Sequence, residues 1–168
     1  MSESGTATGV VVREPGEGPA TWAMGSLFEH LVGPGHTEGL LGVSLVTQPS
    51  GIATPLHQHT HEAEAFYVLS GRVTYRGGDE TWELYDGCFV WLPRGVPHAF
   101  RIRGDEPARL LSLTAPGGLM GLYDEVGIPA AERRLPGQDG QPPEVELPRW
   151  AEVGPRYGLE VLGPPIPE

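Results

Sequence analysis

The stretch GIATPLHQHTHEAEAFYVLSG, residues 51–71, decides the fold of this chain. It places His57 and His59 two residues apart, and Glu64 follows the second histidine by five residues. Successive side chains of a β-strand point to opposite faces, so the two histidines share one face about 7 Å apart. The run from Glu64 to Leu69 is rich in β-branched and aromatic residues and predicts the next strand, after a short turn.

A second stretch, GCFVWLPRGVPHAF at residues 87–100, supplies a third histidine on a later strand. The segment HAFRIR that begins at His98 alternates apolar and basic residues, so His98, Phe100 and Ile102 are predicted to share the inward face. Three imidazoles and a carboxylate are a ligand set that a borderline first-row metal ion prefers. Ligands from separate strands can meet on one ion only in a closed or nearly closed sheet. The sequence therefore predicts a β-barrel that holds a metal.

The two stretches resemble the two signature motifs of the cupin family. The first motif is a glycine, five residues, His-x-His, four residues, Glu, six residues and a glycine; the second is a glycine, five residues, Pro-x-Gly, two residues and His. The residues that match are Gly51, His57, His59, Glu64, Gly71, Gly87, Pro93, Gly95 and His98. The family often ends its second motif in asparagine, where this chain has Ile102. The resemblance implies an all-β fold, a cupin double-stranded β-helix or jelly-roll barrel, in a single-domain monocupin.

The chain is predicted to be organised around this barrel. Residues 1–20 are polar and glycine-rich, which predicts a flexible N-terminal arm. Residues 21–116 carry the cupin barrel, with the first motif at 51–71 and the second at 87–102. Between the motifs, Gly77-Gly78 predicts a hairpin turn.

Residues 117–168 are predicted to form a C-terminal helical extension and tail. Short helices are expected near 118–126 and 148–157, separated by a polar linker at 135–143, and the last residues are expected to be extended. The helices are expected to pack on the outside of the barrel or over one end, and whether they form a lid stays open.

Composition excludes several classes of function. A formal net charge of −11 argues against nucleic acid, because phosphate binding needs a basic surface. No apolar run is long enough to cross a membrane, and the N-terminal residues lack the features of a signal peptide. The single cysteine, Cys88, excludes an internal disulfide and predicts a reducing, cytoplasmic location.

The inward-facing residues predict the character of a substrate pocket. Phe66 and Val68 lie on the same face as Glu64, and Phe100 and Ile102 lie on the same face as the third histidine. Such a pocket suits an apolar or aromatic ligand better than a sugar, whose hydroxyls would lack partners. The same four residues could instead be core, since side chains fill the interior of small barrels.

Segments that flank the motifs, of the types GEGPATWAMGS and RYGLEVLGPP, are similar to those of quercetinase-like cupins. That resemblance implies that His57, His59, Glu64 and His98 bind one divalent transition metal ion per chain: nickel, iron, manganese, cobalt, copper or zinc. It further implies a metal-dependent dioxygenase that acts on a small aromatic, flavonol-type substrate. In that reaction Glu64 takes the substrate's hydroxyl proton, and dioxygen cleaves the heterocyclic ring with release of carbon monoxide.

Two other classes of function stay open. One is a non-oxidative metal-dependent cupin, an isomerase, cyclase or epimerase of polyketide or secondary metabolism, because a metal and Glu64 would serve enolisation there equally well. The other is a non-catalytic cupin that binds a small molecule. An apolar sheet edge beside the N-terminal arm also predicts a homodimer.

Four residues near the motifs have competing readings. Glu62 competes with Glu64 for the role of ligand carboxylate, and the motif spacing favours Glu64. His61 falls in the turn and is predicted to be exposed. Tyr67 and Trp91 lie on predicted core strands and are predicted to serve packing.

Overall fold

Strands dominate the chain, as the alternation of apolar and polar residues predicts. The structure, a computed structural model, describes residues 9–137 and 146–168. The strands are β1 (Ala20–Ala23), β2 (Ser26–Val32), β3 (Gly42–Gln48), β4 (Pro55–His59), β5 (Ala63–Ser70), β6 (Arg72–Gly77), β7 (Glu80–Leu84), β8 (Phe89–Leu92), β9 (His98–Arg103), β10 (Ala108–Ala115), β11 (Ile128–Pro129) and β12 (Leu159–Pro165), and the helical segments are η1 (Gly117–Leu119), α1 (Met120–Val126), α2 (Glu146–Val153) and η2 (Gly154–Tyr157). The prediction of an all-β chain with short C-terminal helices is confirmed.

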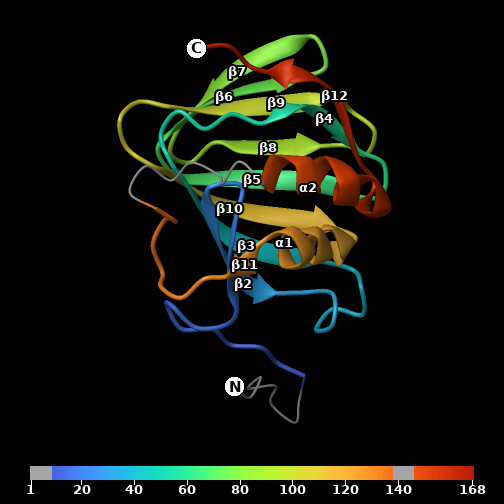
Figure 1. The fold of residues 1–168 in the computed structure, drawn as a ribbon. Helices are drawn as coiled ribbons and strands as arrows, with labels where there is room; N and C mark the ends of the chain where they lie inside the picture. The colour runs from blue at the N-terminus through green and yellow to red at the C-terminus, as the bar shows by residue number, and fades with distance from the viewer. Residues whose placement is uncertain (1–8, 138–145) are drawn as a thin grey trace.

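Two antiparallel sheets make up the jelly roll (Figure 1). One has seven strands in the order β11-β1-β2-β3-β10-β5-β8, and the other has five in the order β12-β4-β9-β6-β7. The hairpin predicted at Gly77-Gly78 joins β6 to β7. Side chains alternate in burial along β3 and β10, so each strand presents one face to the interior. The two interior faces meet in one buried cluster: Phe66, Val68, Val73, Tyr75, Leu92, Phe100, Ile102, Ala108 and Leu110.

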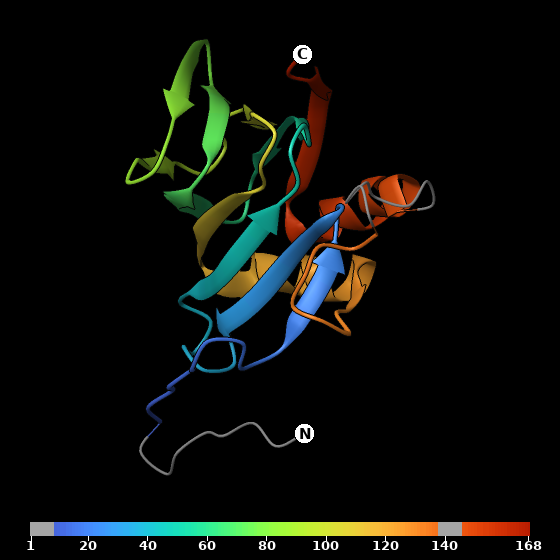
Figure 2. The ribbon, with the colours of Figure 1, turned by 90° about the vertical axis from the view of Figure 1, so that its left-hand side faces the viewer.

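The C-terminal helices pack over one end of the barrel, on the inner face of the seven-stranded sheet. Val46 of β3 lies opposite Leu110 of β10, whose side chain belongs to the interior cluster. Val46 itself belongs to a second buried cluster that includes Leu122 of α1 and Trp150 of α2. Both views place the helices against this sheet and below the five-stranded one (Figures 1 and 2). The helices therefore pack against the seven-stranded sheet.

The C-terminal tail forms a strand that closes one sheet edge. β12 pairs with β4, with Leu159 opposite His59 and Val161 opposite His57. At the far edge of the other sheet, β11 pairs with β1 through Ile128. The edge of β1 expected beside the N-terminal arm is therefore paired in part, whereas Ile128 on the new edge is exposed, and the homodimer stays a prediction.

Two predicted segments fall partly outside the described residues. Residues 1–8 of the predicted arm and residues 138–143 of the predicted linker lie there. Within the described part of the arm, Arg13 Nε donates a hydrogen bond to the carbonyl of Leu31 at 3.3 Å, so this segment runs beside β2. Among the described residues, no helix has the length and apolar character needed to cross a membrane.

The outer face of β5 and β8 carries exposed aromatic residues. Tyr67 lies opposite Phe89 across the two strands, and the exposed fractions of Tyr67, Phe89 and Trp91 are 41%, 58% and 55%. Leu69 extends this surface along β5. Tyr67 and Trp91 lie on core strands, as expected, but the prediction that they serve packing does not hold within the barrel: Val68, between Tyr67 and Leu69, is the residue that faces the interior, and the strand alternates.

His30 on β2 is buried and makes two polar contacts within the seven-stranded sheet. Its ring nitrogens lie 3.1 Å from Thr21 Oγ1 and 3.0 Å from Ser44 Oγ. Burial lowers the pKa of His30 below its ordinary value of 6.5; Asp124 opposes this shift and Arg133 adds to it. The folded protein therefore favours the neutral ring.

This histidine predicts a loss of stability in weak acid. Below about pH 6.5 His30 is protonated in the unfolded chain but stays neutral in the folded protein, because its pKa there is lowered. The free energy of unfolding therefore decreases as the pH falls. The free energy of unfolding should drop by up to about 1.4 kcal/mol per pH unit from this residue, until the lowered pKa is reached. Urea titrations of the wild type and of His30→Gln between pH 7.5 and 5.5 would measure the difference in slope. Equal slopes in the two proteins would contradict the prediction.

Candidate metal centre

Strand β4 brings two of the predicted ligands to the interior. Because side chains alternate along the strand, His57 and His59 face inward and are buried, whereas Gln58 between them and Leu56 before them are half-buried. Neighbouring strands β9 and β12 fix β4 on both sides. The two histidines therefore lie on the same face of β4, as the sequence predicts.

His98 opens β9 directly beside this pair. His98 and His57 are Cα partners across the two strands, and their ring centroids lie 4.3 Å apart. The ring of His59 lies 5.2 Å from that of His57 and 5.3 Å from that of His98. One ligand nitrogen from each of the three histidines lies within 4.8 Å of the other two. The three buried imidazoles form a group that can hold a metal ion.

Glu64 reaches this group from the opposite sheet. It lies near the start of β5, is almost fully buried, and places Oε2 3.4 Å from His59 Nε2 and 3.5 Å from His98 Nε2. The turn between β4 and β5 carries the chain from the five-stranded sheet to the seven-stranded one. The structure thus brings all four predicted ligand side chains together across the barrel.

Backbone carbonyls orient two of the histidine rings. Nδ1 of His57 donates a hydrogen bond to the carbonyl of Pro55 at 2.7 Å, and Nδ1 of His98 donates one to the carbonyl of Val96 at 2.9 Å. A ring whose Nδ1 carries the proton presents the lone pair of Nε2, which is the form that binds metals. Both rings therefore turn Nε2 toward the centre.

The charges in the group push its pKa values in opposite directions. Burial, with the neighbouring His98 and His59, lowers the pKa of His57 to about 3. Burial also opposes a charge on His59, but Glu64 and Glu62 outweigh it, so the pKa of His59 is raised. Burial opposes ionisation of Glu64 as well, yet the facing histidines hold its pKa below the usual value. At neutral pH His57 is neutral and Glu64 is ionised, as metal ligands must be.

Buried polar atoms without hydrogen-bond partners gather around the histidines. Within the described residues, these include His98 Nε2, the Tyr75 hydroxyl and Thr114 Oγ1. The ring of Tyr75 stacks 6.2 Å from that of His98, and Thr114 lies opposite Glu64 across β10 and β5. Native proteins rarely leave buried polar groups unpaired, and an unplaced ion or ligand is one physical reason for doing so. The residues present therefore fit a metal ion.

The motif glycines shape the backbone around the site. Gly71, which ends the first motif, has a positive φ of 105°, and a Cβ there would come within 2.8 Å of the Cα of Ala108. No L side chain fits such a position without a backbone shift. The tight turn from β5 into β6 therefore requires this glycine, which explains its place in the motif.

Sequence reasoning did not single out Tyr75 or Tyr123, and it weighed Glu62 only as a rival ligand. Glu62 is not a rival ligand; its Oε1 lies 2.8 Å from Nδ1 of His59, on the side of the ring away from Glu64. Tyr75 comes from β6, between the motifs. Tyr123 comes from α1, and burial raises its pKa, as do the charges of Glu64 and Glu62. The three-residue spacing of Glu62 from His59 was the only available signal.

The predicted pocket residues all belong to the buried interior cluster. Phe66 and Phe100 face each other edge to face with centroids 6.3 Å apart, and Val68 and Ile102 are buried beside them. His61, outside the cluster, is exposed as predicted. Whether the four apolar residues line a substrate pocket stays a prediction.

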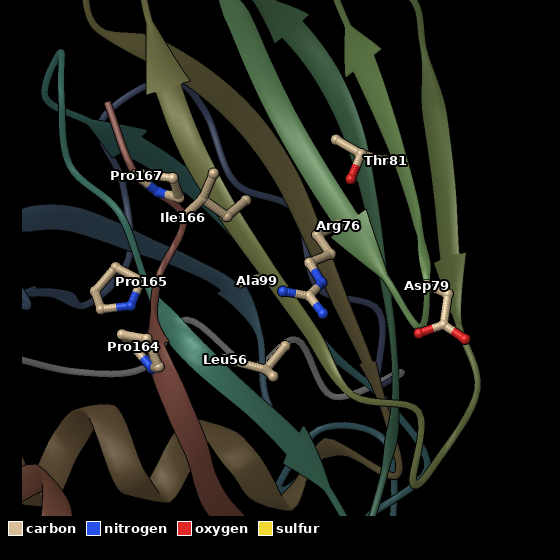
Figure 3. A pocket seen from close by; sticks show the side chains of 9 residues that line it. All are labelled: Leu56, Arg76, Asp79, Thr81, Ala99, Pro164, Pro165, Ile166 and Pro167. Carbon is tan, nitrogen blue, oxygen red and sulfur yellow. The ribbon is translucent and has the colours of Figure 1, made fainter.

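A cavity of about 430 Å³ lies away from the histidines, on the outer side of the five-stranded sheet. Figure 3 shows the tail residues Pro164 to Pro167 along one side and Arg76 and Asp79 on the other. A smaller cavity of about 250 Å³ lies beside α1 and is lined in part by His30 and Asp124. Neither cavity is lined by the predicted ligands.

Comparison with known proteins gives a consistent family assignment. A family model described as the cupin domain matches residues 44–114. Quercetin 2,3-dioxygenase of Bacillus subtilis is 31% identical over 117 residues, which are 70% of this chain but only 34% of the dioxygenase. An uncharacterized protein of Methanocaldococcus jannaschii, MJ1618, is 30% identical over 95 residues, 55% of this chain and 74% of that protein.

Two further similarities bear on function and on fold. Polyketide synthase CurC of Streptomyces cyaneus is 32% identical over 93 residues, 54% of this chain and 59% of that protein. A solved structure described as a predicted oxalate decarboxylase of Thermotoga maritima superposes with a TM-score of 0.57 at 19% identity, covering 64% of this chain and 99% of that one. At that identity the superposition supports the jelly-roll fold alone.

Proposed function

This chain belongs to the cupin family, and we propose that it is a metal-dependent dioxygenase acting on a small aromatic compound with an enolisable hydroxyl, of the flavonol type. One observation carries the proposal: three buried histidines and Glu64 converge from two sheets on one point inside the barrel. The similarity to quercetin 2,3-dioxygenase supports the reaction class.

The proposed roles follow from the contacts of each side chain. One divalent transition metal ion would be held by His57, His59, His98 and Glu64. Nickel, iron, manganese, cobalt, copper and zinc are each suited to this set of ligands. A bound ion would supply Lewis acidity toward the substrate hydroxyl and a position where dioxygen and substrate meet. Glu64 is ionised at neutral pH, so its carboxylate accepts the hydroxyl proton.

Aromatic side chains near the ligands support an aromatic substrate. Phe66 and Phe100 follow Glu64 and His98 by two residues on their strands and so share the same interior face. We assign the wall of the substrate pocket to these two rings, with Val68 packed behind them. Ile102, on the same face of β9 as Phe100, completes this proposed wall.

A non-oxidative reaction is the second candidate. The similarity to polyketide synthase CurC favours an isomerase, cyclase or epimerase of polyketide metabolism. Such a reaction would use the same ligands and the same proton transfer to Glu64, without consuming dioxygen. A cupin that binds a small molecule without turnover is the third.

Oxygen uptake separates these functions. The purified protein would be stripped of metal, reconstituted with each of the six metals, and assayed for oxygen consumption with quercetin. A flavone that lacks the 3-hydroxyl is the matched control, because it offers no proton to Glu64. Oxygen uptake that requires both the metal and the hydroxyl supports the dioxygenase. A metal-loaded protein that converts an enolisable compound without oxygen uptake overturns it in favour of the second candidate, and tight binding without turnover favours the third.

We also propose that the chain forms a homodimer through the exposed aromatic face of β5 and β8. Tyr67, Leu69, Phe89 and Trp91 line this face without a charged side chain among them. The net charge of −11 opposes contact between copies elsewhere on the surface, so this uncharged apolar face is the favoured contact.

Replacing Trp91 by Asp should convert the dimer to a monomer. Loss of a central aromatic contact and burial of a charge are expected to weaken association by about 2 kcal/mol or more, roughly thirtyfold. Light scattering at micromolar concentration should give twice the 18.0 kDa chain mass for the wild type and the single mass for the variant. Val161→Asp, on the exposed part of β12, is the control and should stay dimeric. A monomeric wild type would refute the proposal.

A further inference from the structure

The three histidines differ in what holds the nitrogen that faces away from the centre. His57 and His98 each donate Nδ1–H to a neutral backbone carbonyl. His59 instead has a carboxylate there, with Glu62 Oε1 2.8 Å from its Nδ1. Only one of the three imidazoles therefore has an ionisable partner behind it.

Glu62 is buried as deeply as the ligands themselves. Its exposed fraction is 2%, although it lies in the short connection between β4 and β5 rather than on a strand. A buried carboxylate is strongly disfavoured unless a positive group compensates its charge. The contact that the structure gives its Oε1 is Nδ1 of His59, at 2.8 Å.

We infer that Glu62 is a positioning residue of the metal centre, which holds the ring of His59 with Nε2 toward the ion and adds a second negative charge behind it. The inference rests on the proposed metal site. Carboxylates placed behind a histidine ligand fix its tautomer and raise its basicity, and their loss typically weakens metal binding by about 10–100-fold.

The test is the affinity for Co²⁺, measured by competition with a chromophoric chelator. Glu62→Gln keeps the size and an acceptor oxygen but removes the charge, and it should weaken cobalt binding by about 10–100-fold. Glu62→Ala removes the acceptor as well and should weaken it further. Glu106→Gln makes the same charge change at an exposed position in the β9–β10 connection and should bind like the wild type. The thermal midpoints of the metal-free proteins show whether folding is intact.

A merely structural role makes a different prediction. Glu62→Gln would then lower the thermal midpoint of the metal-free protein while leaving cobalt affinity unchanged, and that result overturns the inference. In a double-mutant cycle, Glu62→Gln should have little further effect once His59 is replaced by alanine. Independent effects of the two changes would also overturn it.

The wild type alone provides a readout that needs no variant. In the zinc-loaded protein, nitrogen NMR of the histidine rings should show His59 with its proton on Nδ1 and the metal on Nε2. The opposite arrangement overturns the inference even if Glu62→Gln does not fold. A wild type that binds neither cobalt nor zinc overturns the metal site and this inference together, whereas a metal-loaded wild type without oxygen uptake overturns only the dioxygenase.

Discussion

Replacing His98 by alanine is expected to leave a folded protein that holds almost no metal. The side chain is buried at the start of β9, between the ring of His57 and the carboxylate of Glu64, so it lies at the middle of the ligand group. Its removal deletes a ligand outright, which should cost more than the about 10–100-fold that loss of an outer partner costs. Elemental analysis after reconstitution and dialysis measures the bound metal directly.

The control for this variant is another histidine that the centre does not use. His36 is exposed in the connection between β2 and β3, and His36→Ala should retain the full metal content. Circular dichroism should show the same sheet content in both variants, because the apolar cluster beneath His98 remains intact. Full metal content in His98→Ala would remove the basis of the proposed site. The same analysis applied to His57→Ala and His59→Ala should give the same loss.

Glu64→Gln is expected to separate metal binding from catalysis. The three imidazoles remain, so the variant should keep much of its metal, but the neutral amide cannot accept the substrate's proton. General-base catalysis typically contributes about 10²–10⁴-fold, and oxygen uptake should fall by that factor. Metal content and oxygen uptake must be measured on the same preparation, so that a loss of activity is not confused with a loss of metal.

The pH dependence of the Glu64→Gln variant tests the base role itself. Its residual rate should rise as the pH approaches the pKa of the substrate hydroxyl, since solution then removes the proton that Glu64 no longer takes. The wild type, in which Glu64 is ionised across the neutral range, should show a much smaller rise. Unchanged activity in Glu64→Gln would rule out the assigned role, while parallel pH profiles would assign the loss to something other than proton transfer.

The features that the sequence predicts well are those set by local pattern. Alternation along a strand is enough to bring His57 and His59 to one face, and the motif spacing is enough to select Glu64 over Glu62 as the carboxylate between the rings. The same alternation along β5 places the side chain of Tyr67 on the outer face of the sheet, since Phe66 and Val68 on either side of it face the interior. A hydrophobic side chain on a core strand is not necessarily buried, because about half of the side chains of such a strand point away from the interior.

Features that depend on contacts between distant segments were out of reach. Nothing in the motifs indicates that β12 lies beside the histidine strand or that β11 pairs with β1. These placements result from packing of the whole chain rather than from local propensity. The role of Glu62 could not be predicted for another reason. The number of residues between a histidine and a carboxylate does not show whether the carboxylate contacts the metal ion or the far side of the histidine ring.

The pairing of β12 with β4 has a consequence for how the centre is assembled during synthesis. Leu159 lies opposite His59, so the strand that supports two of the histidines gains its outer neighbour about a hundred residues after it leaves the ribosome. Until residues 159–165 emerge, the backbone edge of β4 is open on the nascent chain, and its histidines lack their final support. A stall or a cut upstream of Leu159 should therefore yield a barrel that folds in part and binds metal poorly.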